Sequence, residues 1–207
     1  MGADDRLARV GAILDQAARV HDEVRRGDLA PVLRVVEALE AAFARGGKAL
    51  LFGNGGSAAD AQHFAAELVG RFQRVRAARP ALALSTDTSV VTAIANDEGY
   101  ERVFARQIEA LGAPGDVAVA ISTSGASPNV LAALTVARAR GVRTVALTGK
   151  DGGPVGAAAD IHVNVPHASA ARVQEVHRTL MHAICELVED GIEGDGGKEK
   201  GKRKKER

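Results

Sequence analysis

Two polar side chains four residues apart, His63 and Glu67, are the first groups in this sequence that could carry out chemistry. A spacing of four places both side chains on one face of a helix. Imidazole nitrogens and carboxylate oxygens can hold a zinc ion, and the same groups can move protons. An isolated His-x-x-x-Glu pair is most often an ordinary surface pair, so the neighbouring sequence must decide between these uses.

A glycine-rich turn stands immediately before this pair. Residues 50–67 are typical of a buried strand, a Gly-Asn-Gly-Gly-Ser turn at 53–57, and the start of a helix. Glycine lets a ligand approach the backbone closely, and Ser57 is placed to cap the helix. The first N–H groups of a helix lack internal partners and attract anions. The turn therefore predicts a polar cradle for an anion or a polyol.

A second polar loop, Ser-Thr-Ser-Gly-Ala-Ser at residues 122–127, also stands between a predicted strand and a predicted helix. Its hydroxyls and backbone N–H groups suit a phosphate. It is not a P-loop, because the required Gly-Lys-Ser/Thr is absent. One serine-rich turn alone would more often be a capped turn. Two such loops on neighbouring strands favour a phosphorylated, hydroxyl-rich ligand held between them.

The last helical stretch adds Gln174, Glu175, His177 and His182. A glutamine carbonyl oxygen is a rarer zinc ligand than histidine or glutamate. Gln174 and His182 are eight residues apart, roughly 12 Å along a regular helix. Spacing alone therefore does not join them into one site with the first pair.

Strands alternating with helices must position these groups. Strands are predicted at residues 48–52, 81–84, 116–121, 142–147 and 161–165, with helical stretches between them. This alternation predicts an α/β fold with three layers, a five-stranded parallel sheet flanked by helices. In such sheets ligands bind where loops leave the carboxyl ends of the strands. Both polar loops occupy positions of that kind.

The two ends of the chain differ from this pattern. Two amphipathic helices over about residues 5–46 predict an N-terminal helical hairpin, whose apolar stripe is either core or a contact with a second subunit. Residues 1–191 are expected to form a single domain including this hairpin. Residues 192–207, rich in Gly, Lys, Arg and Glu, are expected to form a disordered basic tail.

Composition limits the class of protein. Aromatic residues make up only 3% of the 207 residues, so the core must be aliphatic. The single cysteine, Cys185, excludes an intrachain disulfide and is expected to be a buried hydrophobe rather than a reactive thiol. Without residues 195–207, 20 basic residues face 23 acidic ones, and this balance does not favour nucleic-acid binding. With neither a signal-peptide pattern nor a membrane-spanning apolar run, the expected location is cytoplasmic, with no membrane partner.

Three motifs together resemble the phosphoheptose isomerases, the sedoheptulose 7-phosphate isomerase family within the sugar isomerase (SIS) domain superfamily. They are Gly53-Asn54-Gly55-Gly56-Ser57-Ala58-Ala59-Asp60-Ala61-Gln62-His63, Ser122-Thr123-Ser124-Gly125-x-Ser127 and Arg172-Val173-Gln174-Glu175-x-His177. Shorter matches lie at residues 86–87, 95–97 and 148–153. The resemblance spans about residues 5–190 in unbroken order. It implies the SIS fold and conversion of sedoheptulose 7-phosphate to glycero-manno-heptose 7-phosphate through an enediol, for synthesis of surface-polysaccharide precursors.

The resemblance also implies roles for individual residues. Glu67 would be the base and His182 the acid. One Zn²⁺ per subunit would be held by His63, Glu67, Gln174 and His182. The implied substrate contacts are Asn54, Gly55, Gly56, Ser57, Glu67, Asn96, Asp97, Ser122, Thr123, Ser124, Ser127 and Gln174. Some members carry an acidic residue where this chain has Ala171, so any catalytic help from that position is absent. The family is typically homotetrameric, with active sites at subunit contacts.

Two alternatives stay open. Some related SIS proteins bind the replication initiator protein and regulate DNA replication without catalysis, and residues 170–174 look somewhat like that branch. The presence of both Glu67 and His182 favours the enzyme. An isomerase of a shorter sugar phosphate is a further alternative, less consistent with the order of the motifs.

Overall fold

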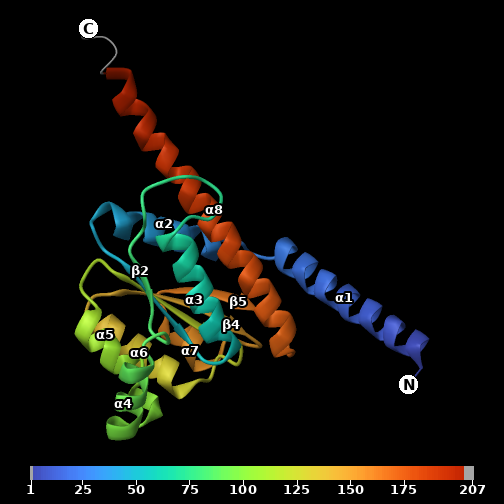
Figure 1. The fold of residues 1–207 in the computed structure, drawn as a ribbon. Coiled ribbons are helices and arrows are strands. Elements are labelled where there is room, and N and C mark those ends of the chain that lie inside the picture. Colours follow the sequence, from blue (N-terminus) through green and yellow to red (C-terminus); the bar gives the residue numbers. More distant parts are fainter. Residues whose placement is uncertain (1, 203–207) are drawn as a thin grey trace.

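A computed structural model describes residues 2–202, with side chains described for residues 2–191 (Figure 1). Its centre is a parallel sheet with the strand order β2-β1-β3-β4-β5. The strands are β1 (Ala49–Gly53), β2 (Ala81–Ala83), β3 (Val117–Ser122), β4 (Arg143–Gly149) and β5 (Ile161–Val165). The predicted α/β fold with five parallel strands is confirmed.

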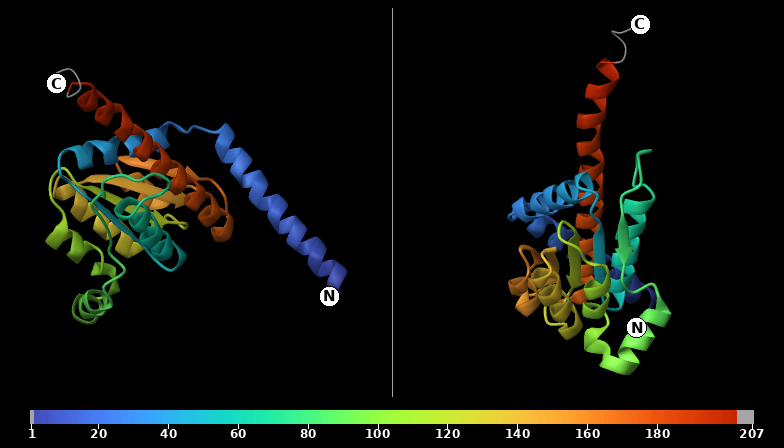
Figure 2. Two further views of the ribbon diagram at one scale, coloured as in Figure 1. Left: turned by 45° about the horizontal axis from the view of Figure 1, so that its top comes forward. Right: turned by 90° about the vertical axis from the view of Figure 1, so that its left-hand side faces the viewer.

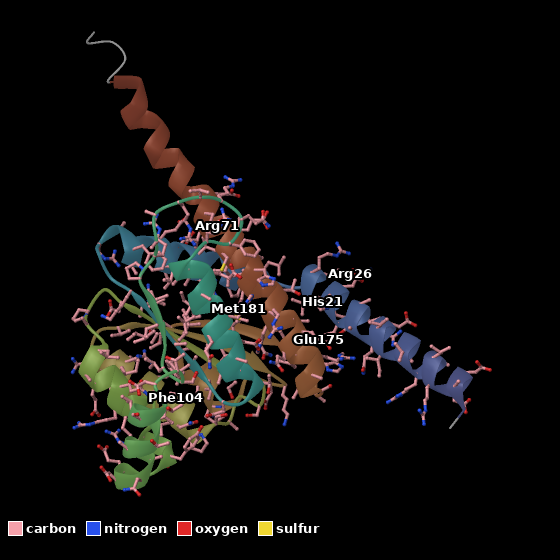
Figure 3. All side chains as sticks on the ribbon, in the orientation of Figure 1. His21, Arg26, Arg71, Phe104, Glu175 and Met181 are labelled. Carbon is pink, nitrogen blue, oxygen red and sulfur yellow. The ribbon has the colours of Figure 1, made fainter. Side chains whose placement is uncertain are left out.

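Helices cover both faces of the sheet and give the three predicted layers. Those described are α1 (Ala3–Arg26), α2 (Ala30–Ala44), α3 (Gly56–Val69), α4 (Thr88–Glu98), the 3₁₀ helix η1 (Tyr100–Arg102), α5 (Ala105–Leu111), α6 (Pro128–Ala139), α7 (Gly153–Ala158) and α8 (Ala170–Lys202). One core layer joins α2, α3 and α8 to the sheet, and the other joins α5, α6 and α7. Buried Met181 on α8 and buried Phe104 before α5 mark the two layers in Figure 3.

Successive strand residues alternate between these two layers. Leu51 packs in the layer of α3 and α8, whereas Leu50 and Phe52 pack in the layer of α5 and α6. A strand turns successive side chains to opposite faces, so a strand covered on both sides must be apolar throughout. This explains the aliphatic runs in the sequence of β1 and β3.

The sheet reverses its direction of growth between β1 and β3, which pair although β2 lies between them in the sequence. Their last paired residues are Gly53 and Ile121. The loop after β1 and the loop after β3 therefore leave the sheet side by side. Such a reversal is where open α/β sheets bind ligands.

Both predicted N-terminal helices are present, but α1 leaves the body of the molecule instead of folding back along α2 (Figure 2). Its only buried side chain is Val20. Leu7, Val10 and Leu14 are 70%, 54% and 64% exposed. Near its C-terminal end, α1 contacts α8 through a 2.9 Å hydrogen bond between His21 Nε2 and Thr179 Oγ1. The apolar stripe, predicted to be either core or a contact with a second subunit, is thus not part of the core of this chain.

At the other end, the α8 backbone runs to Lys202, beyond the predicted end near residue 190. Glutamate and lysine are good helix formers, so they can extend a helix. The predicted disordered tail, 192–207, falls on residues whose side chains lie outside the described set, and it stays a prediction. No described helix is long and apolar enough to cross a membrane. The cytoplasmic location stays a prediction.

Candidate active site

A reciprocal pair of amides joins the two ligand loops. Asn54 Nδ2 donates to Asn129 Oδ1 at 2.8 Å, and Asn129 Nδ2 donates to Asn54 Oδ1 at 2.9 Å. Asn129 is buried in the first turn of α6. The side chain of Asn54 is thereby fixed between the loops. The sequence indicated Asn54 through the glycine motif, but Asn129 had no local signal beyond its position after the serine loop.

The loop after β1 depends on close packing of its glycines. A Cβ atom at Gly53 would lie 2.6 Å from the carbonyl oxygen of Ile121 and 2.8 Å from Ser57 Cβ. Gly55 has a φ of 56°, which favours glycine, and it is the N-cap of α3. The prediction that Ser57 caps this helix is therefore wrong. The turn at Gly55 starts α3 at Gly56, so Ser57 is already helical and buried.

The loop after β3 gathers serine hydroxyls at the N-terminus of α6. Ser122 Oγ lies 3.0 Å from Ser127 Oγ and 3.4 Å from Ser124 Oγ. Gly125, with a φ of 67°, packs against the loop after β4, because a Cβ atom there would lie 2.4 Å from the carbonyl oxygen of Gly152. The hydroxyls and the free N–H groups of the helix converge on one place, which suits a phosphate.

Two histidines from distant parts of the sequence meet where α3 packs against α8. His63 Nε2 on α3 and His182 Nε2 on α8 are 2.7 Å apart. Glu67 Oε1 lies 3.6 Å from His63 Nε2. The ring of Phe72 stacks on His182, with centroids 5.3 Å apart. The structure thus brings together three of the predicted metal ligands, which include both predicted catalytic residues.

Gln174 lies over the glycine loop. Its Nε2 donates to Asp60 Oδ2 at 2.8 Å, and the amide lies against Gly56, where a Cβ atom would be 2.6 Å from Gln174 Oε1. Because a carboxylate only accepts hydrogen bonds, the amide nitrogen is assigned to face Asp60, and Oε1 stays an acceptor. No described hydrogen bond joins Gln174 to His63 or His182.

Asp60 is a fully buried carboxylate to which the sequence motifs assigned no role. Besides Gln174, it accepts from Arg178 Nη2 at 2.6 Å and Nε at 3.2 Å. Its place on the buried face of α3 had a signal. Ser57, Asp60, Ala61 and Phe64 recur at helical spacing, and all are buried.

The remaining predicted substrate contacts, Asn96 and Asp97, lie exposed on α4, a helix with no fully buried residue. Asn96 Nδ2 donates to Asp97 Oδ1 at 2.8 Å. The following 3₁₀ helix reaches the ligand loops, because Tyr100 Oη donates to Asn54 Oδ1 at 3.2 Å. Tyr100 is a second residue that the motifs did not indicate.

A protein zinc site usually gathers four nitrogen, sulfur or oxygen donors around one point. Among the described residues, no group of three or more His, Cys, Asp or Glu side chains has the spacing of a metal site. The chemistry of the side chains nevertheless fits, since two imidazole nitrogens face each other, a carboxylate oxygen is adjacent and Gln174 keeps a free Oε1 acceptor. The chemistry of the donors thus fits zinc, and His63, His182 and Glu67 already lie together.

Two buried groups on α8 support the site without lining it. His177 is fully buried, and its Nε2 donates to the carbonyl oxygen of Thr148 at 2.9 Å. Burial lowers its pKa from the usual value. Cys185 is buried, and burial, with the nearby Glu67 charge, raises the pKa of its thiol to about 12. The prediction that Cys185 is a buried hydrophobe is confirmed.

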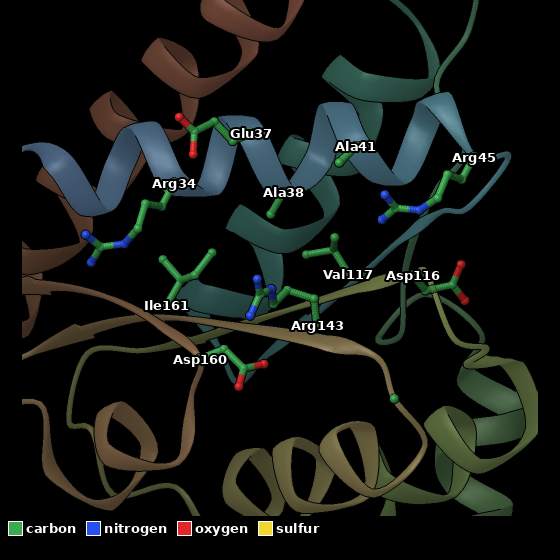
Figure 4. A pocket seen from close by; sticks show the side chains of 12 residues that line it. Arg34, Glu37, Ala38, Ala41, Arg45, Asp116, Val117, Arg143, Asp160 and Ile161 are labelled. Atoms are coloured by element: carbon green, nitrogen blue, oxygen red, sulfur yellow. The ribbon is translucent and has the colours of Figure 1, made fainter.

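A separate cavity of about 510 Å³ lies between α2 and the amino ends of β3, β4 and β5 (Figure 4). Arg34, Arg45 and Arg143 surround it. It contains none of the predicted site residues and opens at the opposite edge of the sheet from the ligand loops.

Comparisons with known proteins agree with the fold and the motifs. The family model described as the SIS domain matches residues 13–149. The phosphoheptose isomerase of Trichlorobacter lovleyi is 54% identical over 165 residues, 80% of this chain and 84% of that protein. That of Geotalea uraniireducens is 51% identical over 189 residues, 91% of this chain and all of that protein.

A solved structure gives the same result. The structure of phosphoheptose isomerase GmhA from Neisseria gonorrhoeae superposes with a TM-score of 0.84 and 44% identity, covering 89% of this chain and 98% of that chain. The fold, the ligand loops and this level of identity lead to one conclusion. The chain belongs to the phosphoheptose isomerase family, SIS-domain enzymes that isomerise sugar phosphates.

Proposed function

We propose that this protein converts D-sedoheptulose 7-phosphate to D-glycero-D-manno-heptose 7-phosphate, the first step in making the heptose precursors of surface polysaccharides. The observation that carries the proposal is the meeting of His63, His182 and Glu67 beside two loops suited to a sugar phosphate. The names of the relatives support the same substrate.

Binding is divided between the two loops. The hydroxyls of Ser122, Thr123, Ser124 and Ser127, with the N-terminus of α6, hold the phosphate. Residues 54–57 and Gln174 bind the sugar hydroxyls, and Asn96 and Asp97 contact the open chain from α4. Because the phosphate is remote from C1 and C2, its binding energy can fix the reacting carbons in place.

The reaction moves one proton between neighbouring carbons. The Glu67 carboxylate removes a proton from C1 of the open-chain ketose while His182 protonates the C2 oxygen, which gives an enediol. His182 then takes the O1–H proton while Glu67 returns its proton to C2, so that an aldehyde forms at C1 and both side chains regain their starting protonation states. General acid–base help of this kind contributes about 10²–10⁴-fold per group.

A zinc ion is part of the proposal. His63, Glu67, Gln174 and His182 would hold one Zn²⁺ per subunit. When bound, the ion would stabilise negative charge on the sugar oxygens. The convergence of the histidine nitrogens and the free Oε1 of Gln174 support this donor set.

A coupled turnover assay on the wild type and Glu67→Gln, with zinc supplied, tests the function. We expect aldose formation by the wild type and a loss of about 10²–10⁴-fold in Glu67→Gln. Glu23→Gln, an exposed carboxylate on α1, is the control and should match the wild type. Activity that survived in Glu67→Gln would remove Glu67 as the base. Wild-type binding of the sugar phosphate without any product would favour the non-catalytic SIS alternative.

We also propose that copies associate as a homotetramer. The exposed stripe of Leu7, Val10 and Leu14 lies on one face of α1 and supports contact with another copy. Leu7→Lys combined with Leu14→Lys should reduce the mass measured by light scattering during size-exclusion chromatography. A mass unchanged from the wild type would exclude this face from the contact.

A further inference from the structure

A buried ion pair fixes the segment between α3 and β2, residues 70–80. Arg76 Nε lies 3.1 Å from Glu189 Oε1 on α8, and the two side chains are only 6% and 2% exposed. Taking two charges out of water costs several kcal/mol per ion unless further hydrogen bonds satisfy them. The function of this pair therefore depends on what else the two groups bind.

Glu189 binds the backbone of the segment at three successive residues. Its carboxylate accepts from the N–H groups of Phe72 at 2.8 Å, Gln73 at 3.0 Å and Arg74 at 3.0 Å. Burial alone would raise the pKa of Glu189, but these three hydrogen bonds and the Arg76 charge outweigh burial and hold that pKa below its usual value. The carboxylate is therefore ionised and fixes the backbone path of residues 72–74.

Arg76 binds the end of α3 from the other side. Its Nη2 donates to the carbonyl oxygen of Glu67 at 2.6 Å, and its Nη1 donates to that of Leu68 at 2.9 Å. These are the last carbonyls of a helix, which lack partners within the helix. The guanidinium thus ties the backbone of Glu67 to Glu189.

The Arg76–Glu189 pair is connected to both proposed proton-transfer residues, His182 and Glu67. Phe72, whose N–H is held by Glu189, stacks on His182 with an angle of 29° between the rings. His182 also contacts His63, with ring centroids 5.0 Å apart. Arg76 contacts Glu67 through its carbonyl oxygen. A shift of the segment would therefore move the support of His182 and the backbone of Glu67 together.

We propose that Arg76 and Glu189 are positioning residues for the isomerase reaction, acting on His182 through Phe72 and on Glu67 through the end of α3. The inference rests on the proposed function. Neither residue belongs to the ligand loops, so loss of the pair should act mainly on the geometry of proton transfer and only weakly on substrate binding.

The kinetic test uses variants that keep the volume of each side chain. In Glu189→Gln and Arg76→Lys we expect kcat to fall about 10- to 100-fold with KM within about threefold, since small misplacement of reacting groups costs this much. Asp190→Asn is the matched control. It removes the exposed 2.7 Å ion pair with Arg74, which joins the same segment to the same helix one residue along. The control should keep wild-type kcat.

The second readout is independent of turnover. Stacking on Phe72 shifts the ring proton resonances of His182, which can be followed by NMR of the metal-free protein with labelled histidine and assigned with His182→Asn. Phe72→Leu defines the unstacked position, and Glu189→Gln and Arg76→Lys should move the resonance toward it. If thermal stability fell while kcat and the His182 resonance stayed at wild-type values, the pair would be structural only. A wild type without turnover would refute the proposed function, and the resonance would still test the positioning.

Discussion

The α3–α8 seam, where Asp60, His63, Gln174 and His182 meet, differs sharply from the α4–η1 arm, residues 88–102. The seam is held by the fully buried Asp60 on α3, which accepts from Gln174 and Arg178 on α8. The arm has no fully buried residue, and its side chains interact through exposed ion pairs such as Arg102–Glu98. Proposed proton-transfer groups lie in the seam, and two proposed substrate contacts, Asn96 and Asp97, lie on the arm.

This difference matches the demands of the two tasks. Proton transfer requires fixed groups, whereas substrate must enter and leave. Segments with few buried contacts open at low free-energy cost, and the arm has that character. Changes in the seam should therefore lower stability and kcat, and changes in the arm should act on KM alone.

The largest effect is expected at Asp60. Asp60→Ala removes the acceptor of both Gln174 and Arg178, and should lower the free energy of unfolding by about 1–3 kcal/mol. Urea denaturation measures this change. Arg178→Ala should also destabilise the fold, because it leaves the fully buried Asp60 carboxylate without its cation. Glu23→Gln, an exposed carboxylate on α1, is the control and should leave the free energy of unfolding unchanged, and an Asp60→Ala variant as stable as this control would exclude Asp60 from holding the seam.

The next largest effect is a pH dependence of the free energy of unfolding, caused by His177. Its pKa is lowered in the folded state by burial, so the unfolded state binds more protons below the usual value of 6.5. Stability should therefore fall as the pH drops below 6.5, by up to about 1.4 kcal/mol per pH unit for one proton.

His177→Gln tests this dependence, because its amide can still donate to the carbonyl of Thr148. Between pH 7.5 and 5.5, the free energy of unfolding measured by urea denaturation should change less with pH in the variant than in the wild type. His162, whose pKa burial also lowers, keeps its contribution in both proteins. A slope identical to that of the wild type would exclude His177 as the source.

A smaller effect, on KM, is expected at Asn129, next to the ligand loops. Asn129→Ala removes the partner of Asn54, and a lost hydrogen bond of about 1 kcal/mol should raise KM about 5- to 10-fold. A double-mutant cycle with Asn54→Ala should give a coupling of at least about 0.5 kcal/mol. Additive effects of the two substitutions would mean that the amide pair does not position the substrate.

The smallest effect is expected at Tyr100, on the arm. Tyr100→Phe removes a single exposed 3.2 Å hydrogen bond to Asn54. KM should rise by no more than about threefold, with kcat and the urea midpoint unchanged. A fall in stability as large as that of Asp60→Ala would erase the distinction between arm and seam.

The sheet and its ligand loops could be predicted because their signals are local. Aliphatic runs identify β1 and β3, and the glycine and serine turns follow them directly. Parallel topology places both loops at the carboxyl end of the sheet, and the pairing of β1 with β3 makes them neighbours. The N-terminal helices were also predictable from periodicity. The path of α1 was not, since an apolar stripe at Leu7, Val10 and Leu14 is the same whether its partner is this chain or another.

The polar partners inside the site could not be predicted in the same way. Asn129 pairs with a residue 75 positions away, and Asp60 with Gln174 114 positions away. The meeting of His63 and His182 was implied by the family resemblance, because spacing on either helix does not reveal a neighbour on the other. Glu189 and Arg76 look like surface charges in the sequence, and only the packing of α8 against the end of α3 buries them.

Cys185 gives the protein a built-in reporter. It is the only thiol in the sequence, lies one helical turn after His182 and is 2% exposed. A soluble disulfide reagent can modify it only when α8 separates from its neighbours, since both burial and a pKa of about 12 suppress the thiolate. The labelling rate under native conditions therefore reports how often α8 separates transiently from its neighbours near the proton-transfer groups.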